Sequence, residues 1–374
     1  MIGGDLGRTP RITVCIPTRN RGTTITPTLE SLRRLDHDSF EVIVVDQSTN
    51  DDCRRTFDQA LGGDARFAYV RSSTVGRAVS CNIGLLHARG IIVAFTDDDC
   101  VVPSNWLSGI EQALDLHPQA AMVCGRITAA PGAGDLGYTP AFTPTHVRLH
   151  RSPWLSYRVA AAGGGNMAFR TAALREAGGF DELLGVGAPL RGGEDKDLLY
   201  RFLRASHPVL ELPEPAIVHH EVLKSGAETR RLLCAYAFGD GVVYAKHLRL
   251  ADPAVIPSMV VMVLRQPRWA NLVLLRRPTG LLTLAAFVRG ITASFRYAVN
   301  PTRRKYAPRR WPRSVASKGM APHPYRAEPP DPHAASGADT PVAAPVARRR
   351  RVSVCVPTSA PAPDYQPPCS KDRC

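Results

Sequence analysis

The 374-residue sequence lacks the features that mark secreted and zinc-binding chains. Its nine cysteines are odd in number and scattered, with no Cys-x-x-Cys pair and no Cys/His cluster at zinc spacing. Most of them stand beside Val, Ile or Ala, which is typical of small buried hydrophobes in a reducing compartment. The opening residues, Met1 to Asp5, contain no apolar signal-peptide core. We therefore expect a cytoplasmic protein whose cysteines are reduced.

Long apolar runs are also missing, since no stretch reaches the roughly 20 residues that span a bilayer. The nearest candidate, residues 279–299, contains Arg289 and, seven residues later, Arg296. An arginine near the centre of a span costs about 2.5–3.5 kcal/mol on insertion scales. A spacing of seven places both arginines on one face of a helix, so the segment is predicted to be amphipathic. Two alternatives stay open: packing on the rest of the protein, which we favour, or lying in a membrane interface.

Acidic residues are scarce toward the C-terminus, where most of the formal charge of +14 is concentrated. Residues 301–374 hold 14 of the 47 Lys and Arg, 5 of the 33 Asp and Glu, and 15 of the 32 prolines. This composition predicts a basic, proline-rich, disordered tail. Basic clusters attract anionic lipid headgroups, so peripheral contact with the inner face of the cell membrane is one expectation. No aromatic platform or motif supports specific binding of nucleic acid.

The tail also repeats the beginning of the chain. Residues 351–358 (RVSVCVPT) match residues 11–18 (RITVCIPT) with five identities and three conservative changes. We interpret this echo as the first strand of a second, truncated copy of the domain. The alternative is a chance match between two stretches rich in Val and Pro. In either case the strand alone is predicted to bind no ligand.

What the first half does contain is an alternation of apolar runs and helical patterns, which predicts an α/β fold. The runs are apolar throughout rather than alternating, as in the buried strands of a parallel sheet. We expect strands at residues 11–17, 41–45, 67–71 and 91–95, and helices at 23–35, 51–61 and 76–88. Residues 129–162 are rich in Pro and Gly and are predicted to form a mobile loop region.

Polar residues follow three of these strands directly. Residues 17–20 end the first strand, Asp46 ends the second, and three aspartates at 97–99 end the fourth. The carboxyl ends of parallel strands share one edge of the sheet, where ligands bind. Three adjacent carboxylates repel one another and have no packing value, so they indicate a site for a hard cation such as Mg²⁺ or Mn²⁺. For the triplet taken alone, a solvated acidic turn is the alternative.

A second acidic group opens a later helix, where Glu194 and Asp195 follow two glycines. Acidic residues at a helix N-terminus can simply complement the helix dipole, and this explanation suffices for Asp197. It is weaker for the first two carboxylates, because the glycines before them let a substrate approach the backbone. Glu194 and Asp195 are therefore candidate catalytic groups.

Together these motifs resemble the family 2 glycosyltransferases of the GT-A fold over roughly residues 10–225. The resemblance implies a mixed, mostly parallel sheet flanked by helices, with a nucleotide-sugar half at 10–128 and an acceptor half at 129–225. A C-terminal helical region at 226–300 precedes the tail. The motifs that carry the resemblance are VCIPTRNR at 14–21, VVDQSTND at 44–51, the helix at 82–90, FTDDD at 95–99, GNMAFR at 165–170 with GGFD at 178–181, and GEDKDL at 193–198.

The resemblance assigns most of these residues to the donor. It implies that a UDP-, GDP- or dTDP-linked sugar is bound by Pro17, Thr18, Asn20, Asp46, Arg77, Asn82 and Asp97. Mg²⁺ or Mn²⁺ would be held by Asp99 and Asp97, with His220 or its neighbour His219 as a further ligand. Asp98 is expected to point away, because alternate residues of an extended segment face opposite sides.

The remaining motifs are assigned to the acceptor and to the chemistry. Asn166 and Met167 are expected under a hydroxyl acceptor, which is a glycan, a lipid-linked molecule or a small molecule in cell-wall or polysaccharide biosynthesis. Asp195 is the expected catalytic base and Glu194 the less favoured candidate. One base without a covalent nucleophile implies a single displacement and hence inversion at the anomeric carbon.

The sequence departs from the family pattern in two places. Cys81 stands where the family often has an arginine, so Arg77 is the alternative contact for the diphosphate, although it is equally explained as a solvated helix residue. No Gln-x-x-Arg-Trp stretch follows Asp195, which argues against a processive synthase. A sugar-phosphate nucleotidyltransferase is the alternative enzyme, but it needs a glycine-rich loop after the first strand. A catalytically inactive scaffold recruited by the basic tail is the alternative from another class.

Overall fold

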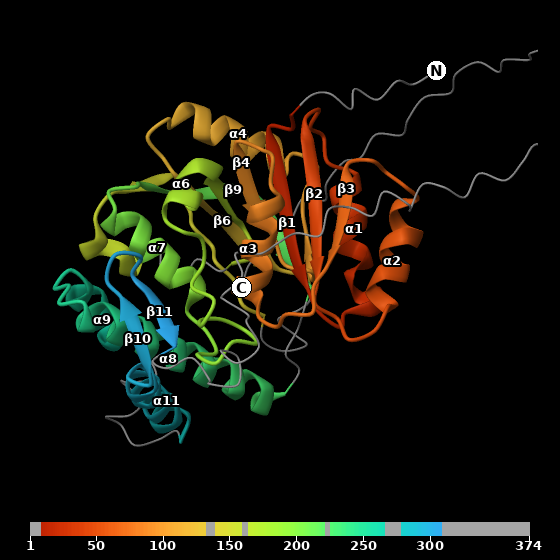
Figure 1. Ribbon diagram of the computed structural model, residues 1–374. Coiled ribbons are helices and arrows are strands. Elements are labelled where there is room, and N and C mark those ends of the chain that lie inside the picture. The colour runs from red at the N-terminus through yellow and green to blue at the C-terminus, as the bar shows by residue number, and fades with distance from the viewer. Residues whose placement is uncertain (1–8, 132–138, 159–163, 221–224, 266–277, 309–374) are drawn as a thin grey trace, which may run out of the picture. The chain divides into compact units, whose positions relative to one another are not determined.

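The computed structural model describes residues 9–131, 139–158, 164–220, 225–265 and 278–308. Figure 1 follows these elements along the chain. The strands are β1 (Ile12–Thr18), β2 (Phe40–Asp46), β3 (Phe67–Arg71), β4 (Ile92–Phe95), β5 (Cys100–Val101), β6 (Met122–Ala129), β7 (Arg148–His150), β8 (Met167–Arg170), β9 (Val209–His219), β10 (Tyr297–Asn300) and β11 (Lys305–Pro308). The helices are η1 (Gly22–Ile25), α1 (Thr26–Arg33), α2 (Asp52–Leu61), α3 (Arg77–His87), α4 (Trp106–Leu116), η2 (Pro153–Arg158), α6 (Thr171–Glu176), α7 (Glu194–Arg204), α8 (Gly226–Arg249), α9 (Val255–Arg265) and α11 (Pro278–Ser294).

One mixed sheet organises the domain, with the strand order β3-β2-β1-β4-β8-β6-β9-β5 and β7 paired to β9. The four strands from β3 to β4 are mutually parallel, and β8 runs antiparallel between β4 and β6. The predicted α/β class is confirmed, and so are the four expected strands and three expected helices, with ends that shift by up to three residues. The described part of 129–162 contains two short elements, β7 and η2, that we had not predicted.

The register of the central strands builds the functional edge. Every residue of β1 and β2 is buried, as expected for strands covered on both faces. Thr18 pairs with Asp46, and Cys15 pairs with Phe95. The carboxyl ends of β1, β2 and β4 therefore meet at one edge of the sheet. Helix α3 packs on β1 and β2, so that its first residue, Arg77, lies at this same edge.

An aromatic cluster joins the sheet to helix α7. The rings of Phe95, Phe169 and Phe180 meet edge to face, with centroids 5.3 to 6.3 Å apart. Phe202 of α7 adds a fourth ring, 5.3 Å from Phe169. Such edge-to-face pairs contribute about 0.5–1.5 kcal/mol each beyond the area that they bury. The cluster fixes the position of α7, whose N-terminus carries Glu194 and Asp195.

A buried ionic cluster joins α7 to α8. The side chain of Lys246, which is fully buried, lies 2.5 Å from a carboxylate oxygen of Asp197 and 2.8 Å from one of Asp181. Asp197 also accepts a hydrogen bond from Arg201 at 2.9 Å and is 3.0 Å from the His247 ring. Burial alone would raise the pKa of Asp197, but Lys246 and Arg201 outweigh it and hold that pKa well below its usual range. The cluster therefore keeps Asp197 ionised within the protein.

The β10–β11 hairpin is fastened to the same cluster. The backbone N–H of Tyr306 donates to Asp181 at 2.8 Å, and its hydroxyl donates to the carbonyl of Val242. The ammonium of Lys305 donates to the carbonyl of Phe180 at 2.7 Å. Tail disorder was expected from residue 301, and the structure differs over 301–308, because buried polar partners bind these residues. The rest of the tail, including the echo at 351–358, lies outside the described residues.

Helices α8 and α11 lie side by side in close contact (Figure 1). A Cβ atom on Gly241 would lie 2.1 Å from the carbonyl oxygen of Phe287, and one on Gly290 would lie 2.1 Å from that of Phe238. Only glycine at these two positions allows the helices to approach so closely. Through this face, α11 packs on the rest of the protein, as the favoured alternative for residues 279–299 predicts. Within the described ranges, no helix combines the length and apolar character that crossing a membrane requires.

Cysteines in the described part of the chain match the expectation of reduced, mostly buried thiols. Six are described, and all six are free. Five of them are buried, and Cys234 is partly exposed. Burial raises the pKa of the Cys15 thiol, which keeps that thiol protonated and unreactive.

Candidate active site

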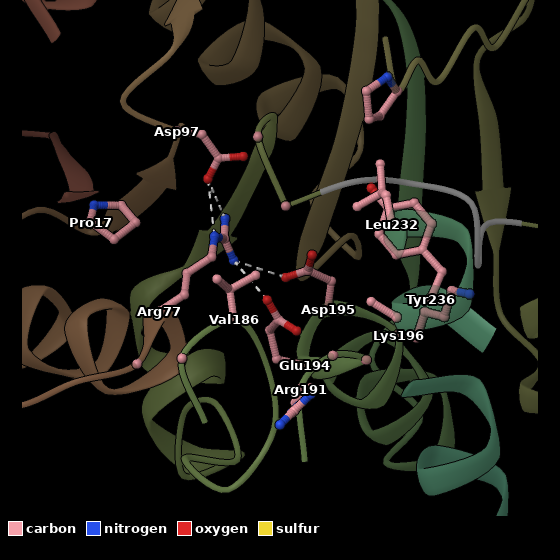
Figure 2. A pocket seen from close by; sticks show the side chains of 18 of the residues that line it. Pro17, Arg77, Asp97, Val186, Arg191, Glu194, Asp195, Lys196, Leu232 and Tyr236 are labelled. Atoms are coloured by element: carbon pink, nitrogen blue, oxygen red, sulfur yellow. Dashed lines mark hydrogen bonds and ion pairs between the residues drawn. The ribbon is translucent and has the colours of Figure 1, made fainter. Parts of the chain in front are cut away.

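A cavity of about 810 Å³ opens at the carboxyl edge of the sheet. One side, which we call the donor edge, consists of Pro17, Thr18, Gln47, Arg77 and Asp97. The opposite side, which we call the helical wall, consists of residues from α8 and α11: Leu232, Leu233, Tyr236, Thr283 and Phe287. Between them lies the N-terminus of α7. Figure 2 shows Pro17 and Asp97 on one side and Leu232 and Tyr236 on the other.

Arg77 connects the two groups of carboxylates that the sequence singled out. Its guanidinium donates to Asp97 at 2.8 and 3.0 Å and to Asp195 at 3.2 Å. Glu194 lies 3.7 Å away on the same side (Figure 2). Burial alone would lower the pKa of Arg77, but Asp97 and Asp195 outweigh burial and raise it well above its usual range. The expectation of a solvated helix residue is therefore wrong for Arg77.

Gly164 leaves the space in which this bridge forms. A Cβ atom there would lie 2.4 Å from a guanidinium nitrogen of Arg77 and 2.6 Å from a carboxylate oxygen of Asp195. Neither group can move away easily, because each is held by the other and is largely buried. The glycine-rich turn at 164–165 thus permits the close approach of its backbone to the charged centre.

The two carboxylates of α7 differ in their surroundings. Burial raises the pKa of Glu194 to about 7, and the neighbouring charge of Asp195 adds to this effect. Burial also raises the pKa of Asp195, but Arg77 acts in the opposite direction. The Asp195 side chain is 20% exposed and that of Glu194 is 8% exposed. Asp195 is therefore the more accessible of the two and the one closer to a permanent cation.

Asp98 and Asp99 of the aspartate triplet lie in a turn, not in an extended segment. All three residues line the cavity, so the expectation that Asp98 points away is wrong. Arg21 pairs with Asp98 at 3.1 Å and with Asp99 at 3.0 Å. Burial raises the pKa of Asp98 to about 6 despite the charge of Arg21. The alternation rule fails here because it applies only to strand geometry.

The histidine that reaches the triplet is His219, and the choice of His220 needs correction. The Nε2 atom of His219 lies 3.3 Å from a carboxylate oxygen of Asp99, and Cys100 completes a group whose donor atoms lie within 4.8 Å of one another. His220 is exposed and contributes only its backbone N–H, which donates to the carbonyl of Asp99. The register explains the difference, because β9 continues through His219 and pairs it with Cys100 of β5.

Asp46 does not line the cavity. Its fully buried carboxylate accepts hydrogen bonds from the backbone N–H and hydroxyl of Ser48, from the hydroxyl of Tyr69 and from Arg71 at 3.1 Å. These partners occupy both carboxylate oxygens. Asp46 therefore holds the ends of β2 and β3 together, and the expected contact with the nucleotide is not supported by its position.

Two asparagines expected at the donor also serve the structure. Asn20, at a positive φ of 55°, accepts a hydrogen bond from the N–H of Thr49. Asn82 donates to the carbonyl of Phe180 at 3.0 Å and accepts from its N–H at 2.8 Å. Neither residue lines the cavity. Asn20 joins the loops after β1 and β2, and Asn82 holds the turn that leads to Asp181.

The expected acceptor residues are buried beneath the cavity. Asn166 accepts a hydrogen bond from the indole N–H of Trp106 at 2.9 Å and donates to the carbonyl of Arg126 at 2.9 Å. Met167 is a core residue of β8, paired with Phe95 and Cys124. The structure thus brings together Pro17, Thr18, Arg77, Asp97, Asp99, Glu194 and Asp195, and it leaves Asn20, Asp46, Asn82, Asn166, Met167 and the side chain of His220 away from them.

Sequence reasoning missed the helical wall. Its five residues lie in α8 and α11, beyond the stretch that carries the motifs. Polar groups also reach the cavity near this wall, where Lys196 of α7 is paired with Asp240 of α8. Apolar positions in a helix show that one face is covered, but not which partner covers it. No signal in the sequence identified these residues as part of the site.

Comparison with known proteins identifies the domain that carries this edge. A model of glycosyl transferase family 2 matches residues 13–178. The chain carries a family 2 glycosyltransferase domain. The matched residues include β1 to β4, Arg77 and the aspartate triplet, and the resemblance drawn from the motifs is confirmed. The match ends before α7, so the catalytic candidates Glu194 and Asp195 lie beyond the matched residues.

Related sequences support the same family. A pre-mycofactocin glycosyltransferase of Mycobacterium tuberculosis is 26% identical over 294 residues, which is 77% of this chain and 57% of the relative. A GalNAc(5)-diNAcBac-PP-undecaprenol beta-1,3-glucosyltransferase of Campylobacter jejuni is 30% identical over 105 residues, 28% of this chain and 34% of the relative. The chain thus spans little more than half the length of the mycobacterial relative.

Solved structures share the fold. The mannosyltransferase PcManGT of Pyrobaculum calidifontis, in complex with GDP-Man and Mn²⁺, has a TM-score of 0.51 at 20% identity and covers 77% of this chain and 88% of that one. Residues 1–349 of TarS from S. aureus have a TM-score of 0.50 at 18% identity, covering 75% of this chain and 81% of that one. Both likenesses support the GT-A architecture.

Proposed function

We propose that this glycosyltransferase moves a sugar from a nucleotide-sugar donor to a hydroxyl acceptor, with inversion at the anomeric carbon. One observation carries the proposal: Arg77 joins Asp97, at the end of β4, to Asp195, at the start of α7, inside one cavity. A cation at this point can neutralise a diphosphate that leaves with extra negative charge. The carboxylate beside it can accept the proton of the attacking hydroxyl.

Asp195 is the proposed base. It is more accessible than Glu194, and Arg77 favours its ionised form. Glu194, whose pKa is raised to about 7, is partly protonated at neutral pH. A neutral Glu194 beside Asp195 avoids the repulsion that two adjacent charges would create. The two carboxylates can therefore take different roles. The proposed reaction uses Asp195 as its base and no covalent nucleophile, so it is one displacement with inversion.

A divalent cation fits the other end of the cavity. Asp99 and His219 offer an oxygen and a nitrogen within reach of one another, and Asp97 lines the same space. Cys100 is the weakest candidate of the group, because burial raises the pKa of its thiol well above the usual range. Mg²⁺ takes oxygen ligands and keeps several waters, so an imidazole in the set favours Mn²⁺. When bound, the ion would stabilise the charge of the departing nucleoside diphosphate as a Lewis acid.

Donor, acceptor and location remain proposals of broader class. The nucleotide is UDP, GDP or dTDP, and GDP-Man belongs in the donor panel because PcManGT holds it. The acceptor is a glycan, a small molecule or a lipid-linked molecule, and the Campylobacter jejuni relative is named for a lipid-linked substrate. We propose work in polysaccharide or cell-wall biosynthesis on the cytoplasmic side of the membrane. Transfer between such partners needs no nucleic acid.

A transfer assay tests the proposal. The protein is incubated with a panel of nucleotide sugars, candidate acceptors and Mn²⁺ or Mg²⁺, and release of the nucleoside diphosphate is measured. We expect Asp195→Asn and Asp99→Asn each to lower kcat a hundredfold or more, as loss of a base or of metal ligation does. Asp115→Asn changes an exposed acid of α4 and serves as the matched control.

The outcomes separate the alternatives. Near-normal transfer by Asp195→Asn removes the assignment of the base, and near-normal transfer by Asp99→Asn removes that of the metal ligand. Consumption of a nucleoside triphosphate with release of pyrophosphate would indicate a nucleotidyltransferase. Absence of any transfer across the full panel would favour the inactive scaffold.

A further inference from the structure

The outward face of α11 is apolar. Leu281, Ala285 and Val288 follow one another at the helical spacing of four and three residues, and Leu282 lies beside them. Leu281 is 57% exposed and Val288 is 48% exposed. A helix on the surface of a globular protein normally places polar residues on this face. The outward face of α11, defined by these four residues, therefore needs a partner.

The opposite face of α11 is already occupied. Thr283 and Phe287 line the cavity, and Gly290 packs on Phe238 of α8. Around the helix these positions lie about 100° to 180° from Leu281 and Val288. The apolar residues of the outward face are consequently not needed for packing on the described part of the protein.

Cations accompany the outward face. Arg289 of α11 and Arg296 of the turn that follows α11 are both exposed, and each directly follows an exposed apolar residue, Val288 or Phe295. Within the part of the chain that the structure describes, neither arginine side chain has an ion-pair partner. The sequence contains no Asp or Glu between residues 253 and 327, although it contains 14 Lys and Arg there. The adjoining chain on either side of α11 thus offers no carboxylate to neutralise these arginines.

We infer that the outward face of α11, with Arg289 and Arg296, docks on a lipid bilayer that contains anionic lipids. Such a surface supplies both partners that the face lacks, an apolar layer and a layer of negative headgroups. A second copy of the face is a poorer partner, because it would set arginine against arginine. The inference goes beyond the proposed transfer reaction and does not depend on it.

Docking in this way would place the site near the lipid surface. A helix with its side chains is about 10–12 Å across. Since Thr283 and Phe287 line the cavity from the inward face of α11, a bilayer on the outward face would lie about one helix diameter away. An acceptor anchored in that bilayer would need only a short reach to enter the cavity beside the helical wall.

Co-sedimentation of the full-length protein with vesicles tests the inference. The vesicles consist of phosphatidylcholine alone or of phosphatidylcholine mixed with phosphatidylglycerol. We expect binding only to the mixed vesicles and a loss of tenfold or more in affinity for the double variant Leu281→Glu, Val288→Glu. The control is Leu116→Glu, which introduces one glutamate at a 70% exposed leucine of α4 and should bind as the unmodified protein does.

A second pair of variants tests the charge. Arg289→Gln with Arg296→Gln should weaken binding by about fivefold per arginine, and added salt should weaken binding of the unmodified protein. Arg54→Gln with Arg55→Gln removes the same charge from α2 and should have little effect. Both sets of variants change exposed residues outside the cavity, so transfer to a water-soluble acceptor should be unchanged. This readout separates failure of docking from failure of the proposed function.

Four results would overturn the inference. The first is that the unmodified protein does not bind the mixed vesicles. The second is that the variant Leu281→Glu, Val288→Glu binds them as well as the unmodified protein, in which case the basic tail carries the binding. The third is that Leu116→Glu causes the same loss of binding, which would show that the effect is not specific to α11. The fourth is that light scattering shows a dimer for the unmodified protein and a monomer for the variant Leu281→Glu, Val288→Glu, which would mean that a second copy of the chain covers the outward face of α11.

Discussion

The donor edge and the helical wall face each other across one cavity but are built in different ways. The donor edge consists mainly of residues at or just beyond the ends of buried strands, with Arg77 added from the start of α3, and it is mostly polar and charged. The helical wall comes from two helices more than a hundred residues later in the chain, and it is mainly apolar and aromatic. The sheet fixes the half of the site that handles charge, whereas helix packing shapes the half that an acceptor would meet.

Helix α7 connects the two halves. Its first turn presents Glu194 and Asp195 to Arg77 of the donor edge. Asp197, which is also in the first turn, and Arg201, one turn later, enter the ionic cluster that holds α8. Changes in the cluster are therefore expected to affect the helical wall before they affect the donor edge.

The largest effect is expected from breaking the ionic cluster. Lys246→Met leaves Asp181 and Asp197 with one cation fewer in a fully buried position, and it should lower the free energy of unfolding by about 3 kcal/mol. Chemical denaturation measures this loss. Arg204→Met, which removes a half-exposed cation from Asp252, should cost less than about 1 kcal/mol. Equal losses in the two variants would show that the cluster does not hold α8 more firmly than a surface pair does.

A smaller effect is expected at the donor edge from Arg77→Gln. Burial raises the pKa of Asp195 and Arg77 opposes the rise, so loss of the arginine should raise this pKa further. A proposed base such as Asp195 acts only when ionised, so activity should fall as the pH drops through its pKa. The acidic limb of kcat/KM should therefore move to higher pH by about one unit, with transfer reduced about tenfold at neutral pH.

Arg191→Gln is the matched control for this shift. Arg191 also lines the cavity, but the described interactions include no contact between Arg191 and Asp195. Its replacement should leave the acidic limb where it is. An unshifted limb in Arg77→Gln would mean that Asp195 is not the group whose protonation stops transfer.

How much of this site the sequence reveals depends on how local each interaction is. The ends of β1 and β4 were predictable, because an apolar run followed by Asp97 or Pro17 is a local pattern. The burial of Asp46 under Tyr69 and Arg71 was not, since it depends on the pairing of β2 with β3. In the same way, only the register of β9 against β5 distinguishes His219 from its neighbour.

The acceptor side was harder to predict for a related reason. Asn166 and Met167 belong to a motif. The sequence does not show that Trp106 donates a hydrogen bond to the asparagine, or that the methionine lies between β4 and β6. The residues that replace them in the cavity come from helices whose partners are set by tertiary packing. The comparison of the two halves thus also separates what strand ends reveal from what only the fold reveals.

The smallest expected effect tests the helical wall itself. Tyr236→Ala removes an aromatic ring that lines the cavity opposite Asp97, and it should raise the acceptor KM about threefold to tenfold, as loss of one aromatic contact of about 0.5–1.5 kcal/mol does. The donor KM should stay unchanged, and Tyr236→Phe should retain most of the acceptor affinity because it keeps the ring. If the donor KM rises instead, the helical wall contacts the nucleotide sugar, and the division of the cavity into a donor edge and an acceptor-facing wall is wrong.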